Sequence, residues 1–239
     1  MIFYYYYYMN PILIAAAIIP AVILFIQVYR SDKWEKEPIG LLVSLALLGI
    51  LATMFAMLTE RAGIYILSRF MDSGSLAYQA VFCFGVVALS EEGFKYLMLR
   101  RRTWRSPAFN YQFDGIVYAA FVSLGFALWE NISYVLHYGF GTALLRAVTA
   151  VPGHACFGVF MGAWYGLAKR YDSRRQLGKS RACRILALLS AALLHGCYDF
   201  SASFQQTSYG WIFAVFVLLL FLAAFLLVRQ ASRNDRYVG

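Results

Sequence analysis

Residues 90–95 read Ser-Glu-Glu-Gly-Phe-Lys, which places two adjacent carboxylates inside a segment that is otherwise apolar. An apolar run at 76–89 precedes them, and Tyr-Leu-Met-Leu at 96–99 leads into three arginines at 100–102. A carboxylate in the hydrocarbon core of a bilayer costs at least about 2.5–3.5 kcal/mol on insertion scales. The pair Glu91 and Glu92 therefore needs a structural or chemical reason.

The composition indicates an integral membrane protein. Of 239 residues, 62% are hydrophobic and only 14% are charged, whereas soluble domains carry about 25% charged residues. The net charge of +9 does not indicate a nucleic-acid partner, because the basic residues gather at the ends of apolar runs. That distribution is typical of membrane topology, and the expected surroundings are a lipid bilayer.

The apolar runs predict an all-α polytopic membrane protein, with about seven transmembrane helices around a polar intramembrane site. Each run has roughly the 20 residues that a hydrocarbon core about 30 Å thick requires. We expect a single integral membrane domain over residues 1–239, with a motif-bearing core at about 86–200. The predicted spans are residues 9–29, 40–59, 76–99, 115–136, 142–168, 185–204 and 209–228.

The sequence also predicts a helix break, a surface extension, a basic loop and a membrane anchor. Pro152-Gly153 is expected to interrupt the fifth span, since proline breaks helical hydrogen bonding. Residues 60–75 are expected to form an external extension or a surface helix, and residues 169–184 a basic loop. The five tyrosines at 4–8 are expected to anchor the chain at the membrane interface.

The charge of the loops predicts the orientation. The loops after the first, third and fifth spans and the C-terminal tail hold most of the lysines and arginines. The opposite loops hold only Arg61, Arg69 and Arg146. Because positive residues stay on the cytoplasmic side, the N-terminus is expected outside and the C-terminus in the cytoplasm.

Four further ionisable groups stand in apolar surroundings: Glu130, His154, His195 and Asp199. Each taken alone could be a hydrogen bond between packed helices. Together with the two adjacent glutamates, however, they come from four different predicted spans. Structural ion pairs do not require so many, so we expect these groups to converge on one polar, hydrated cavity.

Helical spacing predicts two local pairs. Glu91 and Lys95 lie four residues apart and share a helix face, so they could form an ion pair; alternatively, Lys95 extends toward the basic end of the helix. The pair would leave Glu92, about 100° around the helix, unexplained. His195 and Asp199 are also four residues apart and share a helix face. The carboxylate could orient the imidazole, as in catalytic and metal sites, or the two could form a polar pair that only holds helices together.

Depth along the spans bears on whether the groups can meet. At about 1.5 Å per residue, His154 and His195 both fall about 15 Å into their spans and could touch. The adjacent glutamates fall nearer the cytoplasmic side, whereas Glu130 and Asp199 fall nearer the outside. Glu91 and Glu130 are therefore expected to fit together least well.

The chemistry that suits these residues is activation of water. A glutamate in a partly wet, low-dielectric site can act as a general base. His154, His195 and Glu92 could hold a zinc ion, which lowers the pKa of a bound water to about 7. Without a metal, the histidines could instead hydrogen-bond a carbonyl and its developing oxyanion. Either version hydrolyses a peptide bond within the bilayer, where the substrate helix must first unwind.

Five ordered blocks resemble the PrsW family of intramembrane proteases, which is distantly similar to the CAAX-protease/Abi group. They cover residues from about 86 to 200. The blocks are Glu91-Glu92-x-x-Lys95, Asp114-Gly115-Ile116-Val117-Tyr118, Gly125-Phe126-Ala127-x-x-Glu130-Asn131, His154-x-x-Phe157-Gly158 and His195-Gly196-x-Tyr198-Asp199-Phe200.

The resemblance implies a multi-pass protease of the bacterial cytoplasmic membrane. Members of the family make the first cut in a single-pass anti-sigma factor, near its extracytoplasmic face, in a stress-response cascade. Carried over by position, Glu91 and Glu92 would be the catalytic pair. His154 and His195 would be the histidines of the family motifs, and Glu130 and Asp199 would complete the polar site. The motifs suit both a zinc enzyme and a glutamate enzyme.

Two other functions use the same residues. A proton-coupled transporter or channel would use the carboxylates and histidines as a relay. Transporters usually contain internal repeats with paired broken helices, and this sequence has one clear break and no repeat. A membrane scaffold would use the polar groups only to hold helices together.

Overall fold

The protein is described here by a computed structural model that covers residues 11–204 and 208–238. The tyrosines at 4–8 lie outside these residues. Within the described residues the chain is helical, with no strand beyond an isolated bridge between Tyr111 and Tyr237. Its helices are α2 (Pro11–Ser31), α3 (Ile39–Phe70), α4 (Leu76–Ala80), η1 (Val81–Ala88), α5 (Leu89–Thr103), α6 (Asp114–Tyr138), α7 (Phe140–Val148), α8 (Ala150–Ser173), α9 (Leu177–Ala202) and α10 (Gly210–Arg233).

The prediction of an all-α polytopic membrane protein is confirmed. Six helical segments in the described residues are long and apolar enough to cross a membrane: α2, α3, α6, α7 with α8, α9 and α10. The remaining predicted span, residues 76–99, is divided among α4, η1 and α5. The backbone keeps right-handed helical angles at both junctions. The middle piece, η1, is a π-helix, a form that is rare and often lies near functional sites.

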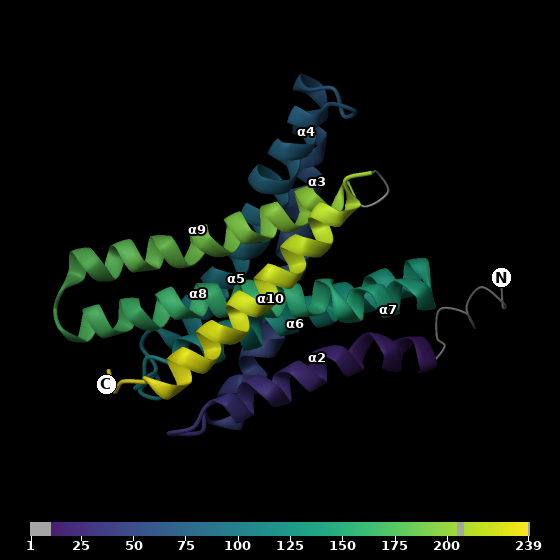
Figure 1. Cartoon of the computed structure of the whole chain (residues 1–239). Helices are drawn as coiled ribbons and strands as arrows, with labels where there is room; N and C mark the ends of the chain where they lie inside the picture. Colours follow the sequence, from purple (N-terminus) through teal and green to yellow (C-terminus); the bar gives the residue numbers. More distant parts are fainter. Residues whose placement is uncertain (1–10, 205–207, 239) are drawn as a thin grey trace.

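The helices cross at two very different inclinations (Figure 1). α6, α8 and α9 lie roughly side by side, whereas α3 and the α4–η1–α5 segment cross them steeply. α6 is the central element, because nearly every residue from Asp114 to Ala127 is buried. α3, α5 and α8 all pack against it.

Glycines permit the closest helix contacts. A Cβ on Gly125 of α6 would lie 2.1 Å from the carbonyl oxygen of Ala46 on α3. A Cβ on Gly162 of α8 would lie 2.4 Å from the carbonyl oxygen of Gly115 on α6. Small residues at such positions let helix backbones approach each other within a membrane. They therefore hold α3 and α8 tightly against the central helix.

Three boundaries differ from the sequence predictions. The break in the fifth span falls at Thr149, between α7 and α8, and Pro152 lies in the first turn of α8. Proline is tolerated there because the first amides of a helix have no carbonyl partner. Residues 169–184 are mostly helical, and only 174–176 connect α8 to α9. The extension after residue 59 continues α3 to Phe70 rather than forming a separate helix.

Candidate active site

Lys95 lies at the centre of the polar residues and holds both adjacent glutamates. It is fully buried on α5, and its Nζ donates to Glu91 Oε2 at 3.2 Å and to Glu92 Oε1 at 2.8 Å. One turn of helix provides this geometry, because residues three and four apart share a face. The predicted Glu91–Lys95 pair is therefore present. Glu92 is paired too, and Lys95 does not extend toward the basic end of the helix.

His154 connects this group to α6. Its Nδ1 lies 3.0 Å from Lys95 Nζ, and its Nε2 lies 2.8 Å from Glu130 Oε2. An ammonium group has only protons to offer, so Nδ1 accepts and Nε2 carries the hydrogen that it donates to Glu130. The contact chain Glu91–Lys95–His154–Glu130 thus runs through α5, α8 and α6.

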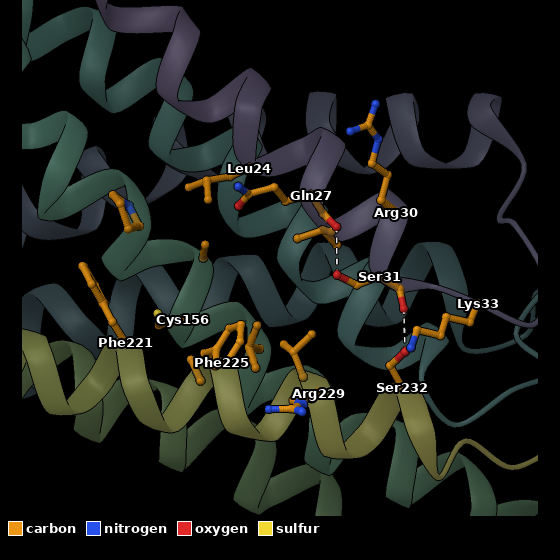
Figure 2. Close-up of a pocket in the computed structure, with 16 residues that line it drawn as sticks. Leu24, Gln27, Arg30, Ser31, Lys33, Cys156, Phe221, Phe225, Arg229 and Ser232 are labelled. Carbon is orange, nitrogen blue, oxygen red and sulfur yellow. Dashed lines mark hydrogen bonds between the residues drawn. The ribbon is translucent and has the colours of Figure 1, made fainter.

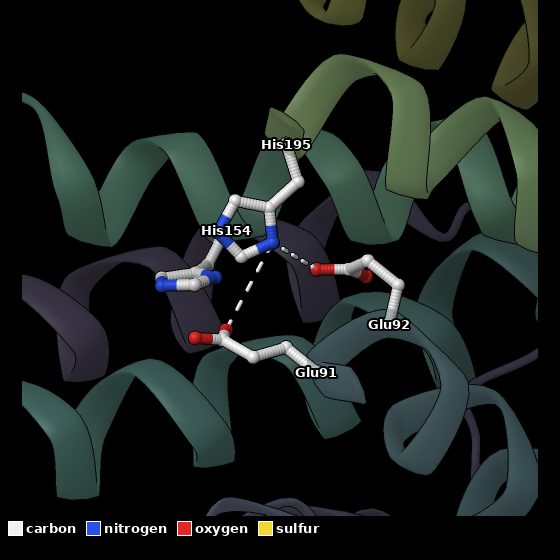
Figure 3. Close-up of side chains that lie close together, drawn as sticks. All are labelled: Glu91, Glu92, His154 and His195. Carbon is white, nitrogen blue, oxygen red and sulfur yellow. Dashed lines mark hydrogen bonds and ion pairs between the residues drawn. The ribbon is translucent and has the colours of Figure 1, made fainter. Parts of the chain in front are cut away.

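His195 lies between carboxylates on both sides of its ring, of which Figure 3 shows Glu91 and Glu92. Nδ1 is 2.9 Å from Glu92 Oε1 and 3.9 Å from Glu91 Oε2. Nε2 is 3.4 Å from Asp199 Oδ2, one turn along α9, as the spacing predicts. The ring stacks on Phe157 with centroids 4.7 Å apart, which fixes its plane. Its orientation is therefore set by both hydrogen bonding and packing.

Arg146 on α7 brings a second basic side chain to the site and pairs with Glu130. It donates from Nη2 to Glu130 Oε2 at 2.9 Å and from Nε to Asn131 Oδ1 at 3.0 Å. The amide of Asn131 in turn donates to the carbonyl of Ala17 on α2 at 2.9 Å. The loop-charge argument treats Arg146 as a residue of an external loop. Its amphipathic helix α7 instead folds back so that the guanidinium faces the carboxylate.

A cavity of about 450 Å³ opens onto these residues. Glu91 lines it, whereas Glu92 is 0% exposed and does not. The walls come from α3, η1 and the helices that carry the polar groups. The polar or ionisable side chains that line it are Glu60, Glu91, Glu130, Arg146, His154, His195 and Asp199, with Thr53, Cys83, Ser133, Tyr134 and Tyr198.

All six predicted site residues are within this one region. Glu91, Glu130, His154, His195 and Asp199 line the cavity, and Glu92 lies directly behind it. The predicted mismatch in depth between Glu91 and Glu130 is wrong. The depth estimate assumes parallel spans, but the helix that carries Glu91 crosses α6 and α8 steeply (Figure 1).

Sequence reasoning missed two residues of the site and part of the role of a third. Arg146 was counted only among the arginines of the outer loops, and Glu60 fell within the predicted extension 60–75. Lys95 was predicted to pair with Glu91 or to extend toward the basic end, but its contacts with Glu92 and His154 were not predicted. Glu60 lies on the continuation of α3, beyond the predicted end of the second span. The helical pattern of the sequence continues past residue 59, and this signal could have placed Glu60 on the same helix as the second span.

The side chains at the site include the types of atom that bind zinc, imidazole nitrogens and carboxylate oxygens. One ligand atom each from Glu91, Glu92, His154 and His195 can be chosen so that all lie within 4.8 Å of one another. Two imidazoles with carboxylates are a common zinc donor set. Glu92 Oε2 is buried and has no hydrogen-bond partner among the described residues. Lys95 Nζ contacts three of these four residues, so a bound metal would have to compete with its positive charge.

A larger cavity lies elsewhere in the described part of the chain, between α2, α8 and α10 (Figure 2). It has a volume of about 750 Å³ and a mostly apolar lining, with Arg30, Lys33 and Arg229 toward one end. Among the described residues that line it, there is no carboxylate and no histidine. Its lining therefore lacks the groups that the expected hydrolysis requires.

Comparisons with known proteins show which family the sequence matches. The sequence profile described as "PrsW family intramembrane metalloprotease" matches residues 37–228. A protein named Protease PrsW from Oceanobacillus iheyensis is 34% identical over 92% of this chain and 96% of its own length. Others with that name are 35% identical, from Geobacillus kaustophilus (93% of each chain), and 31% identical, from Bacillus subtilis (87% of this chain and 89% of the relative). No solved structure matches.

Proposed function

This chain belongs to the PrsW family of intramembrane proteases, and from that premise we propose that it cleaves a single-pass membrane protein with water activated by Glu91. It is a multi-pass bacterial membrane protein, and its enzymatic activity is that of a protease. The substrate, the roles of the residues and the use of a metal are our proposals.

One observation carries the assignment of Glu91. Of the two adjacent glutamates, only Glu91 lines the cavity, while Glu92 is enclosed by Lys95 and His195. A general base must reach the water that it deprotonates. Glu91 is therefore the base, and Glu92 is a positioning residue that orients Lys95 and His195.

The proposed reaction is ordinary peptide hydrolysis. Glu91 takes a proton from water as the oxygen attacks the scissile carbonyl carbon, which produces a tetrahedral oxyanion. The C–N bond then breaks, and the proton held by Glu91 passes to the leaving nitrogen. The products are a carboxylate and an amine. The substrate helix must be unwound locally, because helical hydrogen bonds shield its carbonyls.

The histidines are suited to stabilise the oxyanion. His195 Nε2 lies 3.4 Å from Asp199 Oδ2, a longer contact than the 2.9 Å from Nδ1 to Glu92, and a substrate oxygen would exchange it more readily. His154 is held more firmly, by Lys95 and Glu130. A preformed donor of this kind typically contributes a factor of about 10²–10³ in rate.

A zinc ion, if bound by His154, His195 and Glu92, would supply an acidified water and polarise the carbonyl. The same residues of the chain would hold and orient the reactants in either case. The charge of Lys95 decides between the zinc-dependent and the metal-free mechanism, because its ammonium group lies between Glu92 and His154, two of the residues that would bind zinc.

The substrate is proposed to be a membrane-embedded, anti-sigma-factor-like protein, cut first on its extracytoplasmic side in a stress-response cascade. The family resemblance supports this substrate class. The position of the cavity is compatible with this substrate class. Glu60 of α3 lines the cavity, and α3 continues beyond the predicted end of the second span. On the loop-charge orientation, that extension is extracytoplasmic.

The test combines metal content with cleavage. Purified full-length protein is analysed for zinc and assayed on a single-pass membrane substrate in liposomes, beside a His154→Ala/His195→Ala variant. Near-stoichiometric zinc that the variant lacks would support a zinc enzyme with these ligands. Cleavage by a zinc-free protein would support Glu91 acting on water alone. Undiminished cleavage by Glu91→Gln would contradict both versions.

A further inference from the structure

A second cluster of buried acids lies at the other end of α6. Asp32 and Glu37 are in the loop between α2 and α3, and Asp114 is the first residue of α6. They are 3%, 3% and 1% exposed. One oxygen from each can be chosen so that all three lie within 4.8 Å of one another. Sixteen residues of α6, about 24 Å at 1.5 Å per residue, separate Asp114 from Glu130 in the active site.

No basic side chain within residues 11–204 and 208–238 forms a direct ion pair with Asp32, Glu37 or Asp114. Lys36 donates to the backbone carbonyls of Tyr29 and Asp32, and its charge acts on the Asp32 carboxylate only through space. Buried charges are normally paired or bound to a metal, so one nearby lysine leaves three buried carboxylates short of positive charge.

The hydrogen bonds of the cluster, which include one between the Glu37 and Asp114 side chains, leave one oxygen of Asp32 free. The hydroxyl of Tyr118 donates to Glu37 Oε2 at 2.5 Å, and Asp114 Oδ2 accepts the backbone amides of Asn110 and Tyr111 at 3.0 and 2.7 Å. Asp32 Oδ2 is buried and has no partner among the described residues. An unsatisfied buried oxygen of a charged group is costly. It points to a missing ligand that is positively charged.

We propose that Asp32, Glu37 and Asp114 bind a hard divalent cation such as Mg²⁺, Mn²⁺ or Ca²⁺. Carboxylate oxygens are the donors that these ions prefer, and the cluster offers none of the nitrogen or sulfur donors that favour zinc. Oxygens on opposite sides of such an ion lie about 4–5 Å apart, given bond lengths of about 2.0–2.6 Å. The spacing of the cluster agrees with this.

The cation site would join two separate parts of the chain beside a third, the C-terminal tail. The C-terminal tail packs beside the cluster through Asp235, whose Oδ1 accepts the backbone amide of Phe113 at 2.8 Å. The backbone amide of Gln112 donates to the carbonyl of Arg236 at 2.9 Å. A bound ion would hold the α2–α3 loop and the start of α6 together beneath this tail. We therefore expect it to stabilise the fold rather than to take part in hydrolysis.

The experiment is a Mn²⁺ titration of EDTA-stripped, detergent-purified full-length protein, followed by electron paramagnetic resonance. We expect one Mn²⁺ per chain that the His154→Ala/His195→Ala variant retains. Asp32→Asn is expected to weaken binding at least tenfold, while the exposed control Asp72→Asn leaves it unchanged. A thermal unfolding series with Mg²⁺, Ca²⁺ or Mn²⁺ at constant ionic strength identifies the preferred ion, because a ligand of the folded state raises the midpoint.

Three outcomes would overturn the proposal. Wild-type protein could bind no Mn²⁺ and show no midpoint shift with any of the three ions at millimolar concentration. Binding could be lost in the histidine variant, which would place the ion in the active site. Binding could also survive both Asp32→Asn and Glu37→Gln. The first outcome is measured on the wild-type protein alone. The proposal therefore remains testable even if the substitutions prevent the variants from folding.

Discussion

At the scale of single residues, Lys95 provides the positive charge that stabilises the buried glutamates of the active site. It contacts Glu91, Glu92 and His154 and also lies 3.9 Å from the centroid of the Phe126 ring. A buried ion pair is expensive to form but more expensive to break, because the remaining charge is left unpaired. The two glutamates therefore depend on the lysine for their stability, whichever chemistry they perform.

Replacing Lys95 tests this dependence. Lys95→Met keeps the length of the side chain and removes its charge, which leaves two carboxylates without their cation. We expect the free energy of unfolding to fall by about 3–5 kcal/mol, measured by denaturant unfolding in detergent. The exposed control Lys33→Met should change it little. Equal stability of the two variants would show that another group neutralises the glutamates.

Replacing Glu91 tests its role as the base. Glu91→Gln keeps the shape and a hydrogen-bonding oxygen but cannot take a proton. We expect cleavage to fall by about 10²–10⁴-fold, the usual contribution of general base catalysis. The thermal midpoint should stay close to that of the wild type, and the exposed control Glu35→Gln should keep full activity. A purely structural role for Glu91 would instead lower stability and spare the activity of the folded fraction.

At the scale of elements, the site depends on how closely α6 and α8 approach. Gly115 and Gly162 bring the two backbones into contact, and each helix supplies one partner of the Glu130–His154 hydrogen bond. The contact lies several turns away from that bond. A change in helix separation there should be transmitted along both helices, since an α-helix is stiff over this length.

The substitution Gly162→Ala tests that coupling. The added methyl would lie 2.4 Å from the backbone of α6, so the helices must separate. We expect a loss of about 1–3 kcal/mol, as for other overpacked cores, together with reduced cleavage. The control is Gly178→Ala, where a Cβ meets no atom within 4 Å. That variant should be as stable as the wild type or slightly more stable, because alanine favours helices.

At the scale of the whole molecule, the number of membrane crossings decides the orientation of the loops. If the α4–η1–α5 segment crosses the bilayer, seven crossings place the 71–75 and 174–176 connections on opposite sides. If it does not, six crossings place them on the same side. In Figure 1, α2 begins and α10 ends at opposite ends of the bundle, as an odd number of crossings requires.

Cysteine labelling distinguishes the two counts. Gly74→Cys and Arg175→Cys are introduced separately into a variant without the four native cysteines and treated, in intact cells, with a membrane-impermeant maleimide. We expect labelling of the first and protection of the second, because the positive-inside rule places 174–176 in the cytoplasm. Labelling of both would indicate six crossings and would overturn the predicted orientation.

The sequence by itself determined the features that depend on composition and on local spacing. Long apolar runs require helices in a bilayer, since backbone polar groups have no other partners there. The Glu91–Lys95 and His195–Asp199 contacts follow from the four-residue spacing of a helix. The convergence of six ionisable groups could be predicted because isolated charges are costly in hydrocarbon.

Only the tertiary structure decided which groups touch across helices. The contact chain from Glu91 to Glu130 and the inward position of Arg146 depend on how steeply the helices cross, and no single helix contains that information. The same holds for the cluster of Asp32, Glu37 and Asp114, whose members come from one loop and the start of α6. Distances between helices are set by packing, including the glycine contacts on α6, whereas distances within a helix are set by its own geometry.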